Sequence, residues 1–191
     1  MSSKSVELPV PLRWLTGIAA LCSAFLAMDS LRLFSESPLL DFVITLQNHY
    51  YYALIGLLLP LCYLLNPSFG RPRSYLFDGA LSLAACVSCI FFFINTENML
   101  DYGWEFLAPD YAVWVSYLLW ALILEAVRRS GGWVLFSLVL VFSLYPIVAE
   151  NLPGPISGMA SSPGETAAYH VMSIESILGL PFRAFAQLVI G

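Results

Sequence analysis

Glu125, Arg128 and Arg129 are the residues whose types and spacing most suggest chemistry. On one helix, side chains three and four residues apart share a face, so Glu125 can form an ion pair with both arginines. An acid inside an apolar helix is also a candidate proton or ion relay. We favour a topological role, in which the arginines anchor one end of a membrane span and neutralise the acid, because Glu125 lies near the predicted helix end.

Two further acids, Asp29 and Asp78, lie near the ends of predicted membrane spans. Each is close enough to the membrane surface for its carboxylate to reach water. Arg71 and Arg73 precede Asp78 in the sequence and are its nearest cations there. We therefore expect structural roles for both acids.

Cys86 and Cys89 form a C-x-x-C motif inside the third apolar stretch. A redox pair of this kind needs a thiolate stabilised by a helix N-terminus or a basic neighbour, and this stretch offers neither. We therefore predict that the two thiols pack as small apolar groups. A membrane thiol–quinone oxidoreductase using Cys86 and Cys89 is the alternative, although such an enzyme needs a second cysteine pair in an outer loop.

Other chemistries find little support in the sequence. His49 and His170 stand alone, whereas a zinc site needs three or four converging ligands. We find no P-loop, nucleophile elbow or paired catalytic carboxylates, and the basic residues are too few and dispersed for a nucleic-acid interface. We predict that the chain is no enzyme, holds no metal or cofactor, and binds no nucleic acid.

The elements that must position these residues are apolar stretches of membrane-spanning length. The chain has 191 residues, of which 59% are hydrophobic and 11% are charged, against about 25% charged residues in a typical soluble domain. Five stretches approach the roughly 20 residues that cross a bilayer. They are Leu12–Leu33, Val43–Leu65, Tyr75–Asn95, Tyr111–Val127 and Gly132–Ala149. Because a backbone in lipid must satisfy its own hydrogen bonds, we expect an all-α, polytopic transmembrane bundle.

Orientation follows from the basic residues, which collect in alternate gaps between the stretches. One side receives Lys4, Arg13, Arg71, Arg73, Arg128 and Arg129. The other side receives Arg32 and, near the C-terminus, Arg183. The loop between the third and fourth stretches is acidic, with Glu97, Asp101, Glu105 and Asp110. This distribution predicts a cytoplasmic N-terminus and an acidic outer face.

A different kind of segment follows the fifth stretch. Ser162 and Glu165 have the spacing of a capping box, with Pro163 at the first helical position. We expect an interfacial helix over about 163–178 that carries His170 and Glu175. Gly179 should end it and Pro181 should start a sixth span, which the sequence shows only in part, so we expect the chain to be the front part of a longer protein.

Several of these features occur in a familiar order from residue 77 onward. They are Asp78-Gly79-Ala80-Leu81, Asn95-Thr96-Glu97, Leu122-Ile123-Leu124-Glu125-Ala126-Val127-Arg128-Arg129, Tyr145-Pro146, Leu152-Pro153-Gly154-Pro155 and Glu175-Ser176-Ile177-Leu178-Gly179-Leu180-Pro181. Together they resemble the N-terminal part of fused TRAP (tripartite ATP-independent periplasmic) transporter permeases of the TAXI-associated type. Those permeases join a four-span small subunit to a twelve-span large one.

The resemblance implies a division of the chain and a function. Residues 1–130 would correspond to the small subunit, and residues 131–191 to the first span, interfacial helix and truncated second span of the large subunit. The protein would be a component of a secondary transporter for organic-acid uptake in a bacterial or archaeal inner (plasma) membrane, coupled to sodium and unable to transport alone. Its role would be that of a scaffold.

The resemblance also implies partners. These would be the remainder of the large subunit, the lipid bilayer and a periplasmic substrate-binding protein, which could dock at Glu97, Asp101, Glu105 and Asp110. An orphan membrane assembly protein without a transport partner is a further alternative.

Overall fold

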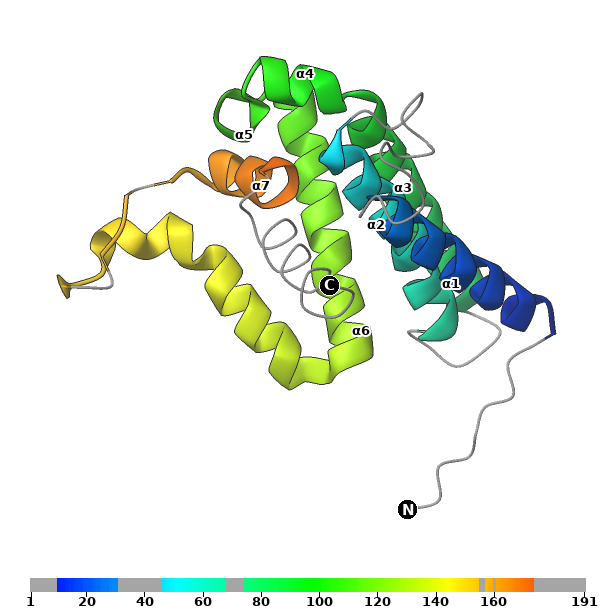
Figure 1. The fold of residues 1–191 in the computed structure, drawn as a ribbon. Helices are drawn as coiled ribbons and strands as arrows, with labels where there is room; N and C mark the ends of the chain where they lie inside the picture. The colour runs from blue at the N-terminus through cyan, green and yellow to red at the C-terminus, as the bar shows by residue number, and fades with distance from the viewer. Residues whose placement is uncertain (1–9, 31–45, 68–73, 155–156, 160, 174–191) are drawn as a thin grey trace.

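The computed structural model describes residues 10–30, 46–67, 74–154, 157–159 and 161–173 (Figure 1). Every regular element in this part of the chain is helical, which confirms the all-α class. The elements are α1 (Val10–Ser30), α2 (Gln47–Leu65), α3 (Ser74–Ile94), α4 (Thr96–Asp101), α5 (Trp104–Leu107), α6 (Asp110–Val148), the 3₁₀ turn η1 (Ala149–Asn151) and α7 (Pro163–Met172).

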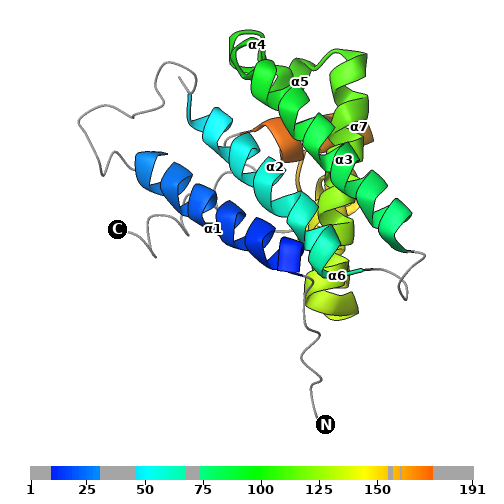
Figure 2. The same ribbon diagram turned by 90° about the vertical axis from the view of Figure 1, so that its right-hand side faces the viewer.

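The long helices run in alternating directions. Figure 2 shows α1, α2 and α3 side by side, with α4 and α5 across the end of the bundle where α3 finishes. The first part of α6 then returns from this end to the one where α3 begins. Residues that begin α3 and residues in the middle of α6 therefore lie at the same end of the bundle.

Helix α6 consists of two arms joined at Gly132, where the chain turns back on itself to form a V (Figure 1). Gly132 has φ 74° and ψ −177°. This is a region that essentially only glycine occupies, because a Cβ would clash there with the backbone. The turn falls at the junction predicted between the fourth and fifth stretches.

Two helical stretches of the described part are long and apolar enough to cross a membrane. They are Leu76–Ile94 in α3 and Asp110–Asn151, which includes both arms of α6 and η1.

Helices α2 and α3 pack closely at a place where α2 lacks one backbone hydrogen bond. Pro60 lies inside α2 and has no N–H to donate to the carbonyl of Gly56 one turn earlier. The Sγ atom of Cys86 lies 4.0 Å from this carbonyl oxygen. A Cβ on Gly56 would lie 3.0 Å from the Cβ of Cys89, so the two helices are in near-backbone contact there.

Helix α7 differs from the predicted interfacial helix in two ways. It ends at Met172, and Ser173 is extended, so the predicted continuation to residue 178 is wrong at its first step. Six of its residues are buried, namely Thr166, Ala167, Ala168, His170, Val171 and Met172. It packs on α5 and on the arms of α6, and the sequence did not predict this burial.

The start of α7 follows the sequence-based prediction. The backbone N–H of Ser162 donates to Glu165 at 2.8 Å, and the Ser162 hydroxyl oxygen accepts from the Glu165 N–H at 3.2 Å. The first of these bonds, with a smaller contribution from the hydroxyl, lowers the pKa of Glu165. The capping box is thus confirmed.

Candidate functional site

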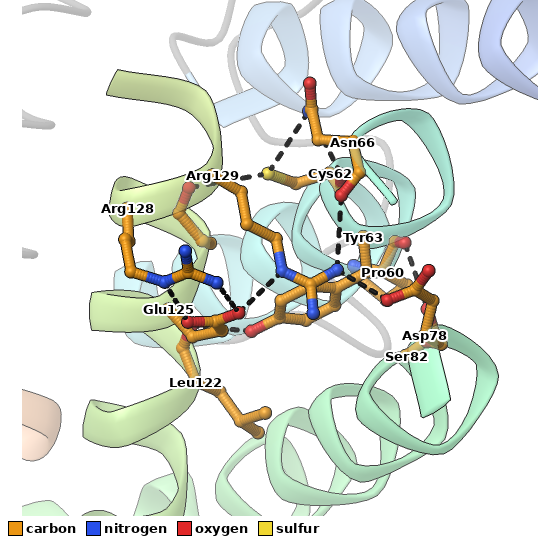
Figure 3. A network of polar contacts seen from close by, with 11 residues as sticks. Pro60, Cys62, Tyr63, Asn66, Asp78, Ser82, Leu122, Glu125, Arg128 and Arg129 are labelled. Carbon is orange, nitrogen blue, oxygen red and sulfur yellow. Dashed lines mark hydrogen bonds and ion pairs between the residues drawn. The ribbon is translucent and has the colours of Figure 1, made fainter. Parts of the chain in front are cut away.

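Arg129 is the centre of a buried ion network that joins three helices (Figure 3). Its Nε donates to Glu125 on its own helix at 2.7 Å. Its Nη1 donates to Asp78 on α3 at 2.7 Å and to the backbone carbonyl of Asn66, just beyond α2, at 3.2 Å. Only 3% of the Arg129 side chain and 4% of the Asp78 side chain are exposed. The network therefore fixes the turn of α6 to the adjoining ends of α2 and α3.

Aromatic rings enclose the Arg129 guanidinium. Its central carbon lies 4.9 Å from the ring centroid of Tyr63 and 5.9 Å from that of Phe77. The Tyr63 hydroxyl in turn donates to the backbone carbonyl of Leu122 on α6. A guanidinium over an aromatic face gains a cation–π attraction that grows as water is excluded. Tyr63 therefore strengthens the link between α2 and α6, and Phe77 strengthens the link between α3 and α6.

Arg128 extends the network across the turn. Its Nε and Nη2 each donate to one oxygen of Glu125 at 2.7 Å, which is the strong two-point geometry of an arginine–carboxylate pair. Its guanidinium also lies 5.2 Å from the ring centroid of Trp133, the first residue beyond Gly132. Arg128 is more exposed than Arg129, at 28% of its side chain. The two arms of α6 are thus connected next to their turn.

The network can hold helices together, but its chemistry argues against a proton relay. A guanidinium stays protonated under all ordinary conditions, so Arg129 cannot pass a proton between its two carboxylates. Glu125 accepts from both arginines and Asp78 from Arg129, so each acid faces a fixed positive charge. One donor, Nη2 of Arg129, is buried and has no hydrogen-bond partner among the described residues.

The structure confirms one of the predicted charge contacts and corrects another. The pairing of Glu125 with both arginines is as predicted. The expectation that Asp78 reaches water is wrong, because it is buried against Arg129, 51 residues later in the chain. Arg71 and Arg73, its predicted neighbours, lie outside the described residues. The alternation of basic residues predicts that Asp78 and Arg129 lie on the same side of the membrane, which is compatible with this pair but does not single it out.

Asp29 requires the same correction. It is buried at the end of α1 and accepts a hydrogen bond from the Tyr50 hydroxyl on α2 at 2.8 Å. This bond links the ends of α1 and α2 that lie opposite the Arg129 network.

The four predicted docking acids lie together at the opposite end of the bundle from Arg129. Glu97 and Asp101 are on α4, Glu105 is on α5, and Asp110 begins α6. Glu105 is half-buried and the other three are exposed. Among the described residues, the lysines and arginines are only Arg13, Arg128 and Arg129, none of which belongs to α4 or α5. This end therefore presents negative charge without a nearby described cation.

A second polar cluster, which sequence reasoning missed, ties α7 into the V of α6. His170 Nε2 lies 2.8 Å from the backbone oxygen of Ser143 on the second arm. The Ser143 hydroxyl accepts from Trp120 Nε1 on the first arm at 2.6 Å. The Tyr52 hydroxyl on α2 donates to the Val171 carbonyl at 3.0 Å. A lone histidine in the sequence gives no sign of such a role, because its partners lie on distant segments.

Both cysteines of the C-x-x-C motif face α2. Cys89 is 2% exposed and packs against Gly56, while Cys86 approaches the Gly56 carbonyl. The cysteines of the described segments are free thiols. These contacts account for both residues through helix packing.

The remaining predicted residues lie outside the part of the chain that the structure describes. Glu175, Gly179, Pro181 and Arg183, with the proposed elbow and sixth span, lie outside the described residues, as do Lys4 and Arg32. Within the described segments, no group of three or more histidine, cysteine, aspartate or glutamate side chains is placed to hold a metal ion. Comparison with family models, curated proteins and solved structures gave no match to this chain.

Proposed function

We propose that this chain is a scaffold component of a TRAP-type secondary transporter for organic acids, embedded in the inner membrane with its N-terminus in the cytoplasm. The observation that carries the proposal is the Arg129 network. It lies at the end of the small-subunit-like residues 1–130 and fastens the turn that leads into residues 131–191. A rigid joint at this place is what a scaffold needs to hold the second part in a fixed position.

The helix lengths are compatible with five spans, while among the described helices only α3 and α6 are also apolar enough to be candidate spans. The first arm of α6 has about 22 residues, or roughly 33 Å of helix, which matches a hydrocarbon core about 30 Å thick. Helices α1, α2 and α3 have 21, 19 and 21 residues. The second arm of α6 is shorter, at about 17 residues, which is the lower limit for a span. The alternating directions of these helices suit repeated crossings of one bilayer.

Charge supports the orientation and a docking role for the outer end. Arg128 and Arg129 lie at one end of the bundle and the acids of α4 and α5 lie at the other, in keeping with the rule that cytoplasmic loops are basic. An exposed acidic surface attracts a partner of opposite charge and raises its association rate. The partner proposed here is a periplasmic substrate-binding protein with a basic docking surface.

Uptake of organic acid by cells that carry the complete transporter tests the proposal. Replacing Glu97, Asp101, Glu105 and Asp110 together with serine should raise the concentration of binding protein needed for half-maximal uptake. The control replaces Glu150, which is also an exposed acid but lies outside the α4–α5 surface. Equal uptake kinetics in the wild type and in the variant with all four replacements would contradict the docking role.

A further inference from the structure

A groove of about 220 Å³ lies between α2 and α3. Ala53 and Gly56 line it from α2, and Cys86, Ile90 and Phe93 line it from α3. Almost all of these surfaces are apolar. The groove lies away from the Arg129 network. It meets the α7 cluster at Tyr52, whose hydroxyl already donates to the Val171 carbonyl, and none of the other residues of that cluster lines it.

The sequence builds this groove through small residues on α2. Gly56 has no side chain and Ala53 has only a methyl group, so α2 leaves space where a larger residue would fill it. At the same place the helices touch, since a Cβ on Gly56 would meet Cys89 at 3.0 Å. The groove is therefore a hollow between two helices that are held in direct contact, and it cannot close by moving them together.

The groove opens onto an apolar face of α3. Ile90 at its rim is 57% exposed. Leu83, Val87 and Ile94, which are also large exposed apolar residues, belong to the same candidate membrane span, Leu76–Ile94. In a bilayer this face of α3 meets hydrocarbon, so whatever enters the groove comes from the lipid phase.

Water is a poor occupant of this space. A buried water needs two to four polar partners, and apolar cavities stay dry. The polar groups at the groove are few: the Gly56 carbonyl, freed by Pro60, the weakly polar thiols of Cys86 and Cys89, and Tyr52, whose hydroxyl already donates to Val171. An empty groove would deprive its walls of dispersion contacts. A flexible hydrocarbon chain restores these contacts and needs no hydrogen bond.

We propose that the α2–α3 groove binds one acyl chain of a membrane phospholipid. This inference rests on the membrane placement in the proposed function and adds a specific ligand site to it. The bound chain would fill the hollow beside Gly56 and stiffen the contact between α2 and α3, on the side of α3 that α6 does not cover.

Lipid retention tests this site directly. The full chain is reconstituted into vesicles of palmitoyl-oleoyl phosphatidylethanolamine and phosphatidylglycerol, extracted in mild detergent and examined by native mass spectrometry. We expect one phospholipid per chain to survive at collision energies that remove all others. Ala53→Phe fills the groove from α2 and Ile90→Trp fills it from the exposed rim on α3, so each should lose this lipid. Leu58→Phe, at an exposed position on α2, should retain it.

The outcomes separate the site from the proposed function. Carbonate extraction first reports whether the chain is integral to the membrane. A chain released by carbonate contradicts the proposed function itself. Three outcomes with a membrane-integral chain overturn the groove inference alone. They are a chain that retains no phospholipid, a chain that retains detergent or a second copy of itself instead, and a chain that keeps its lipid in both filled variants. Because Ile90 is exposed, its replacement tests the groove without disturbing the core.

Discussion

Replacing Arg129 with leucine should destabilise the protein far more than the same change at Arg128. Arg129 is almost fully buried and bonds to Asp78, Glu125 and a backbone carbonyl. Its loss leaves the Asp78 carboxylate buried without a compensating charge from the described residues. Breaking a buried ion pair in this way costs about 3–5 kcal/mol. Arg128 is more exposed and pairs within its own helix, so Arg128→Leu should cost about 1 kcal/mol or less.

Unfolding in mixed dodecylmaltoside–SDS micelles, followed by tryptophan fluorescence, measures both free energies. The double variant Asp78→Leu/Arg129→Leu adds a second check, since removing both charges avoids the unpaired carboxylate. Its destabilisation should be smaller than the sum of the two single changes. Equal destabilisation by the Arg128 and Arg129 changes, or strict additivity in the double variant, would refute the network as the joint between α3 and α6.

Three other changes address the turn, the start of α7 and its attachment. Gly132→Ala places a Cβ at φ 74° and should lower the free energy of unfolding by about 1–3 kcal/mol in the same assay. Gly79→Ala, with open space around it, is the control and should be neutral or stabilising. Equal effects of the two changes would contradict a strained turn. The capping hydrogen bonds hold the pKa of Glu165 below its ordinary 4.5, so their stabilisation is present above that value and is lost as the pH falls through the lowered pKa. As the pH falls, the rate of amide hydrogen exchange in α7 should therefore rise in the wild type relative to the rate in Glu165→Gln. Identical pH profiles in the two proteins would count against the cap. His170→Leu removes the donor to the Ser143 carbonyl at similar volume and should increase proteolysis of α7; unchanged protection would show that this bond is dispensable.

Local features of the fold could be predicted because they depend on neighbours in the sequence. The capping box needs only Ser162 and Glu165, three residues apart, and both of its bonds form. The pairing of Glu125 with its two arginines depends on helical spacing alone. The turn at Gly132 lies at the boundary between two predicted spans, which the arginines and the glycine already mark in the sequence.

Tertiary features were missed because their partners are distant in the chain. Asp78 and Arg129 could be assigned to one side of the membrane, but nothing in the sequence selects this pair from the other charges on that side. The burial of α7 depends on the V of α6, whose angle is set by the backbone at Gly132. His170 acquires its partner only when that V has formed, so its sequence neighbours give no indication of its role.

The most direct measurement is the side of the membrane from which each end of the bundle can be labelled. Single cysteines are introduced at Asp101 and at Ser130, both exposed, in a chain whose native cysteines are replaced by alanine. A membrane-impermeant maleimide is then added to intact spheroplasts. We predict that the cysteine at 101 reacts at once and that the cysteine at 130 reacts only after permeabilisation. Labelling of both from outside, or the reverse pattern, would contradict a bundle that crosses the membrane with the Arg129 network at its cytoplasmic end.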